Sequence, residues 1–259
     1  MTTYSTHIRN RLSRLLPNME PPRYMNVHPQ IEARLASARS NFVQGYLDAL
    51  SATTEALPLL FETLPFHKLG FALEGAAMAV TMLDEFGDPP GGFLTALLTH
   101  RQKTEKVLCA VGIGWASARL GKSYHWLPAE LENHHRPFVA DGYGFHQGFF
   151  HPNMFTDRES PGGNSELTLS YDIGLGRALW FIQFGRFEPI VEVIKRMPLK
   201  RQTQLWQGVG IACAFTGNSE HATALKSIDS GFENNFWTGL EAGKQLLDAL
   251  SRTTKKEIS

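Results

Sequence analysis

The sequence predicts a mainly α-helical protein in which helical hairpins pack as a compact α/α repeat bundle of the tetratricopeptide or solenoid kind. Apolar residues recur every three or four positions along most of the 259 residues, as helices with one buried face require. A Gly-x-Gly-x-Ala pentamer occurs at 112–116, 174–178 and 208–212, each time within an apolar run. The last two pentamers begin 34 residues apart, which is the period of a tetratricopeptide hairpin.

The chain divides into an N-terminal arm (1–30), a single all-helical domain (31–250) and a flexible tail (251–259). Prolines 17, 21 and 22 prevent a continuous helix in the arm. In the domain, the apolar spacing predicts helices over 31–50, 69–86, 93–120, 187–198, 219–231 and 236–250. We expect the small-residue-rich helices to be buried and those between them to be amphipathic and outer.

Two segments stand outside this helical pattern. The stretch "SELTLSYD" (165–172) has enough alternation for a short strand. The stretch "DGYGFHQGFFHP" (141–152) lies where the spacing of the pentamers opens to 62 residues. We therefore predict an insertion or irregular segment between helical pairs at 141–152.

The repeated glycines need a physical reason, because each glycine inside a helix costs about 0.5–1 kcal/mol relative to alanine. Close approach of a neighbouring helix is the favoured explanation, and close approach of a bound ligand is the alternative. A dinucleotide-binding loop is excluded, because it needs a small sixth residue after a buried strand. The sixth residues here are Ser117, Leu179 and Cys213, and no buried strand is predicted before them.

Composition narrows the function classes. The chain has 25 basic and 25 acidic residues, so it lacks the basic excess of a nucleic-acid-binding protein. No run approaches the roughly 20 apolar residues that span a bilayer, so we expect no membrane span and a cytoplasmic location. We expect Cys109 and Cys213, each in an apolar helical run, to be inert core thiols.

Six segments, in order over roughly residues 39–243, resemble the motifs of a family of unknown function encoded beside enediyne polyketide synthases and in other secondary-metabolite clusters. The segments are "NFVQGYLDAL", "GFALEGAAMAV", "VGIGWASARL", "DGYGFHQGFF", "GLGRALWF" and "LWQGVGIACAFTG". The resemblance implies a role in natural-product biosynthesis and names no reaction. The C-terminal region looks shortened relative to typical members.

Four polar residues within these motifs are the candidate catalytic groups. Glu74 and Arg177 lie in otherwise small and apolar segments, so their charges are expected to face the interior and to need partners. An ion pair of Arg177 with Glu74 or with Asp141 would satisfy them, either as a structural pair or as part of an active site. His146 is a candidate general acid/base, and a core histidine at a tight corner is the alternative.

The candidate substrate-binding residues are polar or aromatic residues of the same motifs: Tyr143, Phe145, Gln147, Phe149, Trp180, Trp206 and Gln207. We predict no metal at His146 and His151, because their spacing does not place them on one helix face. The segment "DEFGD" (84–88) matches the carboxylate spacing of terpene synthases, so Asp84, Glu85 and Asp88 are weak candidates for Mg²⁺. The proline-rich continuation argues against that site.

Three functions remain open at this stage. The first is an enzyme of secondary metabolism that acts on a hydrophobic polyene or polyketide-like intermediate by acid/base or cyclisation chemistry, with a terpene-cyclase-like enzyme as a variant. The second is a non-catalytic helical-repeat protein that binds a carrier domain, a peptide or a partner biosynthetic enzyme. The third is a carrier that shields an apolar ligand. Convergence of the four candidate catalytic side chains in one cavity would favour the enzyme.

Overall fold

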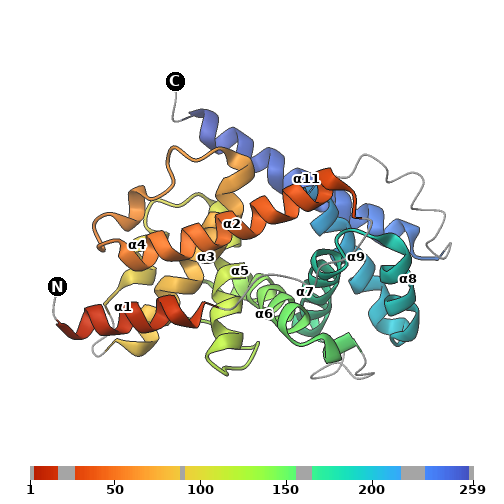
Figure 1. Cartoon of the computed structure of the whole chain (residues 1–259), viewed down its shortest axis with the longest axis horizontal. Coiled ribbons are helices and arrows are strands. Elements are labelled where there is room, and N and C mark those ends of the chain that lie inside the picture. The colour runs from red at the N-terminus through yellow and green to blue at the C-terminus, as the bar shows by residue number, and fades with distance from the viewer. Residues whose placement is uncertain (1–2, 17–26, 88–90, 156–164, 217–230, 257–259) are drawn as a thin grey trace.

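The computed structural model describes residues 3–16, 27–87, 91–155, 165–216 and 231–256, and all regular structure in them is helical (Figure 1). This confirms the predicted all-α class. The α-helices are α1 (Thr3–Leu15), α2 (Pro29–Ser51), α3 (Phe66–Phe86), α4 (Phe93–Leu98), α5 (Lys103–Arg119), α6 (Arg136–Phe150), α7 (Glu166–Ile182), α8 (Phe187–Arg196), α9 (Leu199–Thr216) and α11 (Glu233–Lys256).

The longer helices form a row in which each packs on the next, in the order α2, α3, α5, α6, α7, α9 and α11. The row curls, because α11 also contacts α3 and α5. In Figure 1, α11 runs behind α2 from the upper left of the molecule to the right, where it packs on α9. Six helices of the row therefore surround one region of the interior.

Neighbouring helices approach so closely that only glycine fits between them. In α6, a Cβ on Gly142 would lie 1.9 Å from the Val111 carbonyl oxygen of α5, and one on Gly144 would lie 2.1 Å from the Tyr171 carbonyl oxygen of α7. Two positions along a helix correspond to a rotation of about 200°, so the two glycines face opposite neighbours. Gly-x-Gly is thus the packing signature of a helix in the middle of the row.

Glycines at equivalent positions of α5, α7 and α9 make the same contacts with carbonyl oxygens on both sides: Gly112, Gly114, Gly174, Gly176, Gly208 and Gly210. Backbones this close can form Cα–H···O contacts, which accompany such helix crossings. The predicted packing role of the glycines is confirmed.

This pattern corrects the prediction for 141–152. Residues 141–150 form the C-terminal two thirds of α6, whose Gly142 and Gly144 are a regular member of the series. The prediction failed because His146 stands where the Gly-x-Gly-x-Ala pentamer has its alanine, while Gly142 and Gly144 keep the geometry of the series. The wide gap between pentamers therefore holds a helix of the row, and only the residues after Phe150 leave it.

The segment 165–172, which has enough alternation for a short strand, is helical instead, because residues 166–172 lie in α7. Ser165 caps this helix by accepting a hydrogen bond from the Thr168 amide at 3.3 Å. Thr168, Tyr171 and Leu175 are buried at the three- and four-residue spacing of a helix. That longer pattern outweighs the local alternation.

The single helix predicted over 93–120 is divided into α4 and α5. His100 has a φ of 63°, which a helix cannot contain, and Gln102 begins α5 with a capping box to Glu105. At the C-terminus, α11 continues to Lys256, beyond the predicted end at 250. The helix predicted over 219–231 falls almost entirely outside the described residues.

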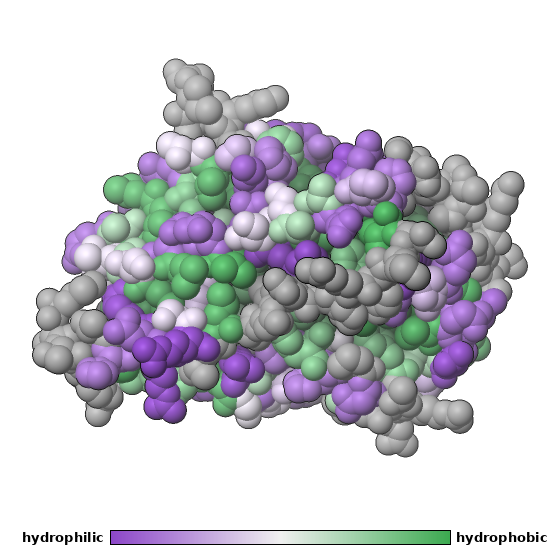
Figure 2. Space-filling view, in the orientation of Figure 1, coloured by the Kyte–Doolittle hydropathy of each residue, from purple (hydrophilic) through white to green (hydrophobic). Residues whose placement is uncertain are grey.

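Residues 3–15 of the N-terminal arm form α1, which packs on α2 and α3. Leu12 is buried, and its carbonyl accepts a hydrogen bond from the Tyr46 hydroxyl at 3.0 Å. Figure 2 shows apolar surface in the seam between the polar outer faces of α1 and α2. The arm thus covers part of the core.

Two contacts show that α7 and α9 run in the same direction. Asp172 pairs with Arg201 near the start of both helices, and Trp180 bonds to Thr216 near the end of both. The chain must therefore return between them, and it does so through α8, whose buried face is Phe187, Ile190, Val191 and Ile194. Assignment to the tetratricopeptide class stays a prediction.

Candidate functional site

Three charged side chains from three helices meet in the interior. Arg177 of α7 donates from Nη1 to Asp141 Oδ1 of α6 at 2.7 Å, and its Nη2 lies 3.5 Å from Glu74 Oε1 of α3. All three side chains are largely buried, and Glu74 keeps only 4% of its surface exposed. The Arg177 guanidinium also lies over the Phe145 ring, 5.2 Å from the centroid. Both ion pairs considered from the sequence are present.

The glycine contacts explain why these side chains converge. Glu74, Asp141 and Arg177 each stand directly beside a glycine of the series in the sequence. The Asp141 carbonyl oxygen faces Gly174, and the Glu74 carbonyl oxygen faces Gly112. Because the helix backbones touch at these glycines, the side chains of the residues next to them are close enough to meet.

Burial sets the protonation of the cluster. Desolvation raises the pKa of Glu74 to about 7, Arg177 opposes this rise, and the negative charge of Asp141 adds to it. Burial also raises the pKa of Asp141 against the opposing effect of Arg177. Asp141 has the shorter contact with Arg177, so Glu74 is the carboxyl group that exchanges a proton near neutral pH.

The cluster forms the polar end of a cavity of about 220 Å³. Helices α3, α5, α6, α7, α9 and α11 all contribute to its wall. The remaining wall is apolar apart from the Gly243 backbone: Val107, Leu108, Val111, Phe138, Ile211, Phe215, Ala242 and Leu246. An apolar pocket with a few convergent polar groups is the usual form of a small-molecule site.

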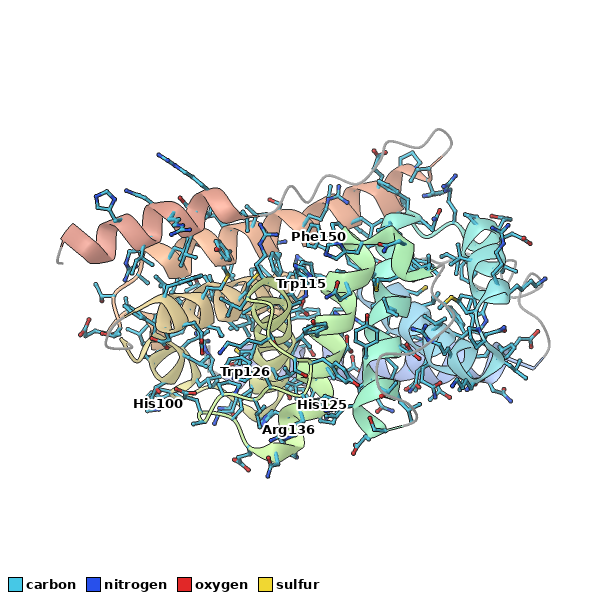
Figure 3. All side chains as sticks on the ribbon, turned by 90° about the horizontal axis from the view of Figure 1, so that it is seen from below. His100, Trp115, His125, Trp126, Arg136 and Phe150 are labelled. Atoms are coloured by element: carbon cyan, nitrogen blue, oxygen red, sulfur yellow. The ribbon has the colours of Figure 1, made fainter. Side chains whose placement is uncertain are left out.

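His146, the fourth predicted catalytic residue, lies elsewhere and does not line this cavity. It packs edge-on against Trp115, with ring centroids 5.8 Å apart, and contacts Phe150 and His151. Figure 3 shows Trp115 and Phe150 together on the side of the N-terminal helices, away from His125 and Arg136. Desolvation, His151 and Arg119 lower the pKa of His146 to about 3, so it is a neutral core histidine at physiological pH. His146 is thus a buried helical residue outside this cavity, and neither ring nitrogen has a hydrogen-bond partner among the described residues, so it is not the satisfied histidine of a tight corner. A catalytic role for it stays a prediction.

Of the predicted substrate-binding residues, only Phe145 touches the charged cluster. Trp180 donates to Thr216 Oγ1 at 2.8 Å in the core, and Tyr143 packs with Tyr124 and Tyr171. The other four, all within the described ranges, do not line the cavity either: Gln147, Phe149, Trp206 and Gln207. The sequence therefore identified the polar end of the site and not its walls.

The proposed Mg²⁺ ligands have other partners. Both Asp84 carboxylate oxygens accept from backbone amides at the start of α4, Phe93 at 3.1 Å and Leu94 at 2.8 Å. Glu85 forms an ion pair with Lys122 at 2.6 Å, and Asp88 lies outside the described residues. Among the described residues, no three His, Cys, Asp or Glu side chains are grouped to hold a metal ion.

Several features were missed from the sequence. A second buried ion pair joins Asp172 of α7 to Arg201 of α9 at 2.6 Å, with each side chain 2% exposed. Asp172 stands two residues before Gly174, one of the glycines at the helix contacts. Nearness to such a glycine is the feature of the sequence that could have predicted this ion pair. The apolar cavity walls carry no such signal, because Ile211 or Leu246 looks like any core residue in a helical pattern. Cys109 and Cys213 are buried, as predicted.

Fold and site together define an all-α protein with an ionisable cluster at one end of an apolar cavity. The chain belongs to DUF1702, a family described as proteins of unknown function, whose sequence profile matches residues 17–240. Neither a search of curated proteins nor a search of solved structures gave a match. Across the described residues, no helix has both the length and the apolar character to cross a membrane.

Proposed function

We propose that this protein is an enzyme of natural-product biosynthesis that uses Glu74 for acid/base chemistry on a hydrophobic, polyene- or polyketide-like intermediate. The observation that carries the proposal is the position of Glu74: a buried carboxyl group beside Arg177 and Asp141 at the polar end of an apolar cavity. A general acid/base works best when its pKa lies near the working pH, and burial brings the pKa of Glu74 to about 7.

In this proposal the three charged side chains have different roles. Protonated Glu74 donates to a carbonyl oxygen or an alkene carbon of the substrate. The resulting carboxylate takes up a proton from a substrate carbon, which restores the acid and completes an isomerisation or cyclisation. Asp141 holds Arg177 through the 2.7 Å bond, and Arg177 stabilises the transient Glu74 carboxylate.

The biosynthetic context is supported by the resemblance of the motifs to proteins encoded in secondary-metabolite clusters. The same motifs supply Glu74, Asp141 and Arg177, so the residues that carry the resemblance also carry the proposed chemistry. The apolar wall suits a hydrocarbon-rich intermediate better than a sugar or a nucleotide.

The test compares metabolites of the native host with and without the gene, and of the deletion strain supplied with variants. Glu74→Gln should accumulate the same intermediate as the deletion, because the amide cannot exchange a proton. Glu105→Gln is the matched control: Glu105 is also a buried glutamate, but it pairs with Arg101 at 3.7 Å at the start of α5. Full complementation by Glu74→Gln would contradict the acid/base role.

A carrier that shields an apolar ligand is the second candidate, because most of the cavity wall is apolar. A carrier needs the cavity and not the proton of Glu74. Under this alternative Glu74→Gln would complement the deletion, and Leu246→Trp, which places a large side chain in the cavity, would not.

A further inference from the structure

Resting on the proposed function, one more property of the same site can be inferred. We propose that the ligand is an uncharged apolar molecule with about ten carbon-sized atoms in the cavity and a hydrogen-bond acceptor, such as a ketone carbonyl, directed at Glu74. The site discriminates against carboxylates and other anionic head groups. The argument depends on which charges face the cavity and how they are already paired.

The charged groups around the cavity are few. Helix α3 supplies Glu74, α6 supplies Asp141 and α7 supplies Arg177. Helix α5 adds the buried Cys109 thiol near Glu74, and the α9 and α11 side chains that line the cavity are apolar. With one cation and two carboxyl groups, the site is neutral when one acid is protonated and negative when both are ionised.

Among the residues that the structure describes, Arg177 is the only cation that lines this cavity, and it is already engaged by the protein. Nη1 bonds to Asp141 at 2.7 Å, Nη2 lies 3.5 Å from Glu74, and the guanidinium covers the Phe145 ring. An incoming carboxylate would share this one positive charge with two carboxyl groups that already lie beside it. Like charges at such distances repel strongly in a desolvated site.

A neutral acceptor meets no such conflict. The protonated Glu74 carboxyl group can donate one hydrogen bond into the cavity, and the site then stays neutral. An ammonium group could pair with ionised Glu74, but it would have to leave water for walls such as Phe215 and Leu246, close to the positive Arg177. The cavity therefore favours a carbonyl over an amine.

The size follows from the volume. A cavity of about 220 Å³ filled at the packing density of a protein interior, about 0.74, holds on the order of ten carbon-sized atoms. A ten-carbon ketone, carboxylate and amine are therefore matched probes: 2-decanone, decanoate and decylamine.

The experiment measures dissociation constants of the three probes by titration calorimetry at pH 6 with the full-length protein. We expect 2-decanone to bind at least about tenfold more tightly than decanoate or decylamine, a difference of about 1.4 kcal/mol. Leu246→Trp should abolish this binding. Lys244→Trp, an equally large addition at an exposed position of the same helix, should leave it unchanged.

The outcomes separate this inference from the proposed function. Tighter binding of decanoate or decylamine overturns the uncharged-ligand class and leaves the acid/base role of Glu74 to its own metabolite test. Absence of binding by all three, or binding that Leu246→Trp does not change, overturns both. Retained 2-decanone binding by Glu74→Gln with loss of complementation would separate recognition from catalysis at this residue.

Discussion

Replacing Glu74 by glutamine should change how the stability of the protein depends on pH. Glutamine has the same shape and cannot ionise, so the difference in unfolding free energy between wild type and Glu74→Gln isolates the titration of this group. In the folded protein the pKa of Glu74 is raised from 4.5 to about 7. The unfolded chain then releases this proton at lower pH than the folded protein.

The sign follows from linkage. Between pH 4.5 and 7 the folded state holds a proton that the unfolded state has lost, so wild-type stability falls as pH rises. Each unit of pKa shift corresponds to 1.36 kcal/mol, and the total loss is therefore about 3 kcal/mol. The stabilisation by the proton that Glu74 retains in the folded state is fully present below pH 4.5 and declines towards pH 7. Above about pH 8 the unfolding free energy no longer changes through Glu74.

Urea unfolding followed by circular dichroism at half-unit intervals from pH 4.5 to 8.5 provides the difference curve. We expect the wild-type advantage over Glu74→Gln to shrink by about 3 kcal/mol across this range. Parallel wild-type and Glu74→Gln curves would mean that Glu74 is ionised throughout, and the acid/base proposal at neutral pH would lose its basis.

Three further substitutions, the first with Gly70→Ala as its control, test other parts of the structure by thermal or urea unfolding. Gly142→Ala should lower the unfolding free energy by more than about 4 kcal/mol, because its Cβ would lie 1.9 Å from a carbonyl oxygen. Gly70→Ala, whose Cβ would lie 3.6 Å from the nearest side-chain atom, should lower it by less than about 1 kcal/mol. Similar losses in the two variants would refute the packing role of Gly142. The unfolding free energy of wild type should fall by several kcal/mol as pH falls from 6.5 towards 3, because the unfolded chain binds a proton that buried His146 does not, and His146→Leu should not show this fall. His146→Leu should also leave 2-decanone binding intact, and loss of binding would return His146 to the site. Asp172→Asn should cost about 3–5 kcal/mol by leaving Arg201 buried without its carboxylate, and a cost below 1 kcal/mol would show that the pair is dispensable.

Much of the fold could be predicted from the sequence, because the helices carry clear apolar periodicity. The two segments that differ from expectation have one common cause: their local composition points away from a helix, whereas their longer-range apolar spacing is helical. The glycines and aromatics of 141–152 suggested an irregular loop, and the alternation at 165–172 suggested a strand. In both segments the contacts with neighbouring helices decide the structure. A short stretch of sequence does not show which distant residues will make these contacts.

The polar part of the site was predictable for a related reason. A charged residue in a small, apolar helix must find a partner, which led to Glu74, Asp141 and Arg177. His146, Tyr143 and Gln147 are predicted together with Asp141 because the four stand close together in the sequence. On a helix, nearness in sequence does not give a shared face: Asp141 and His146 project in different directions from α6, and only Asp141 reaches the cavity.

The most direct test of the central claim is complementation of the deletion strain with wild type, Glu74→Gln and His146→Leu, with the accumulated metabolite measured by mass spectrometry. Wild type and His146→Leu should clear the intermediate, and Glu74→Gln should accumulate it at the level of the deletion. Clearance by Glu74→Gln together with failure of His146→Leu would contradict the assignment of the reaction to the cavity.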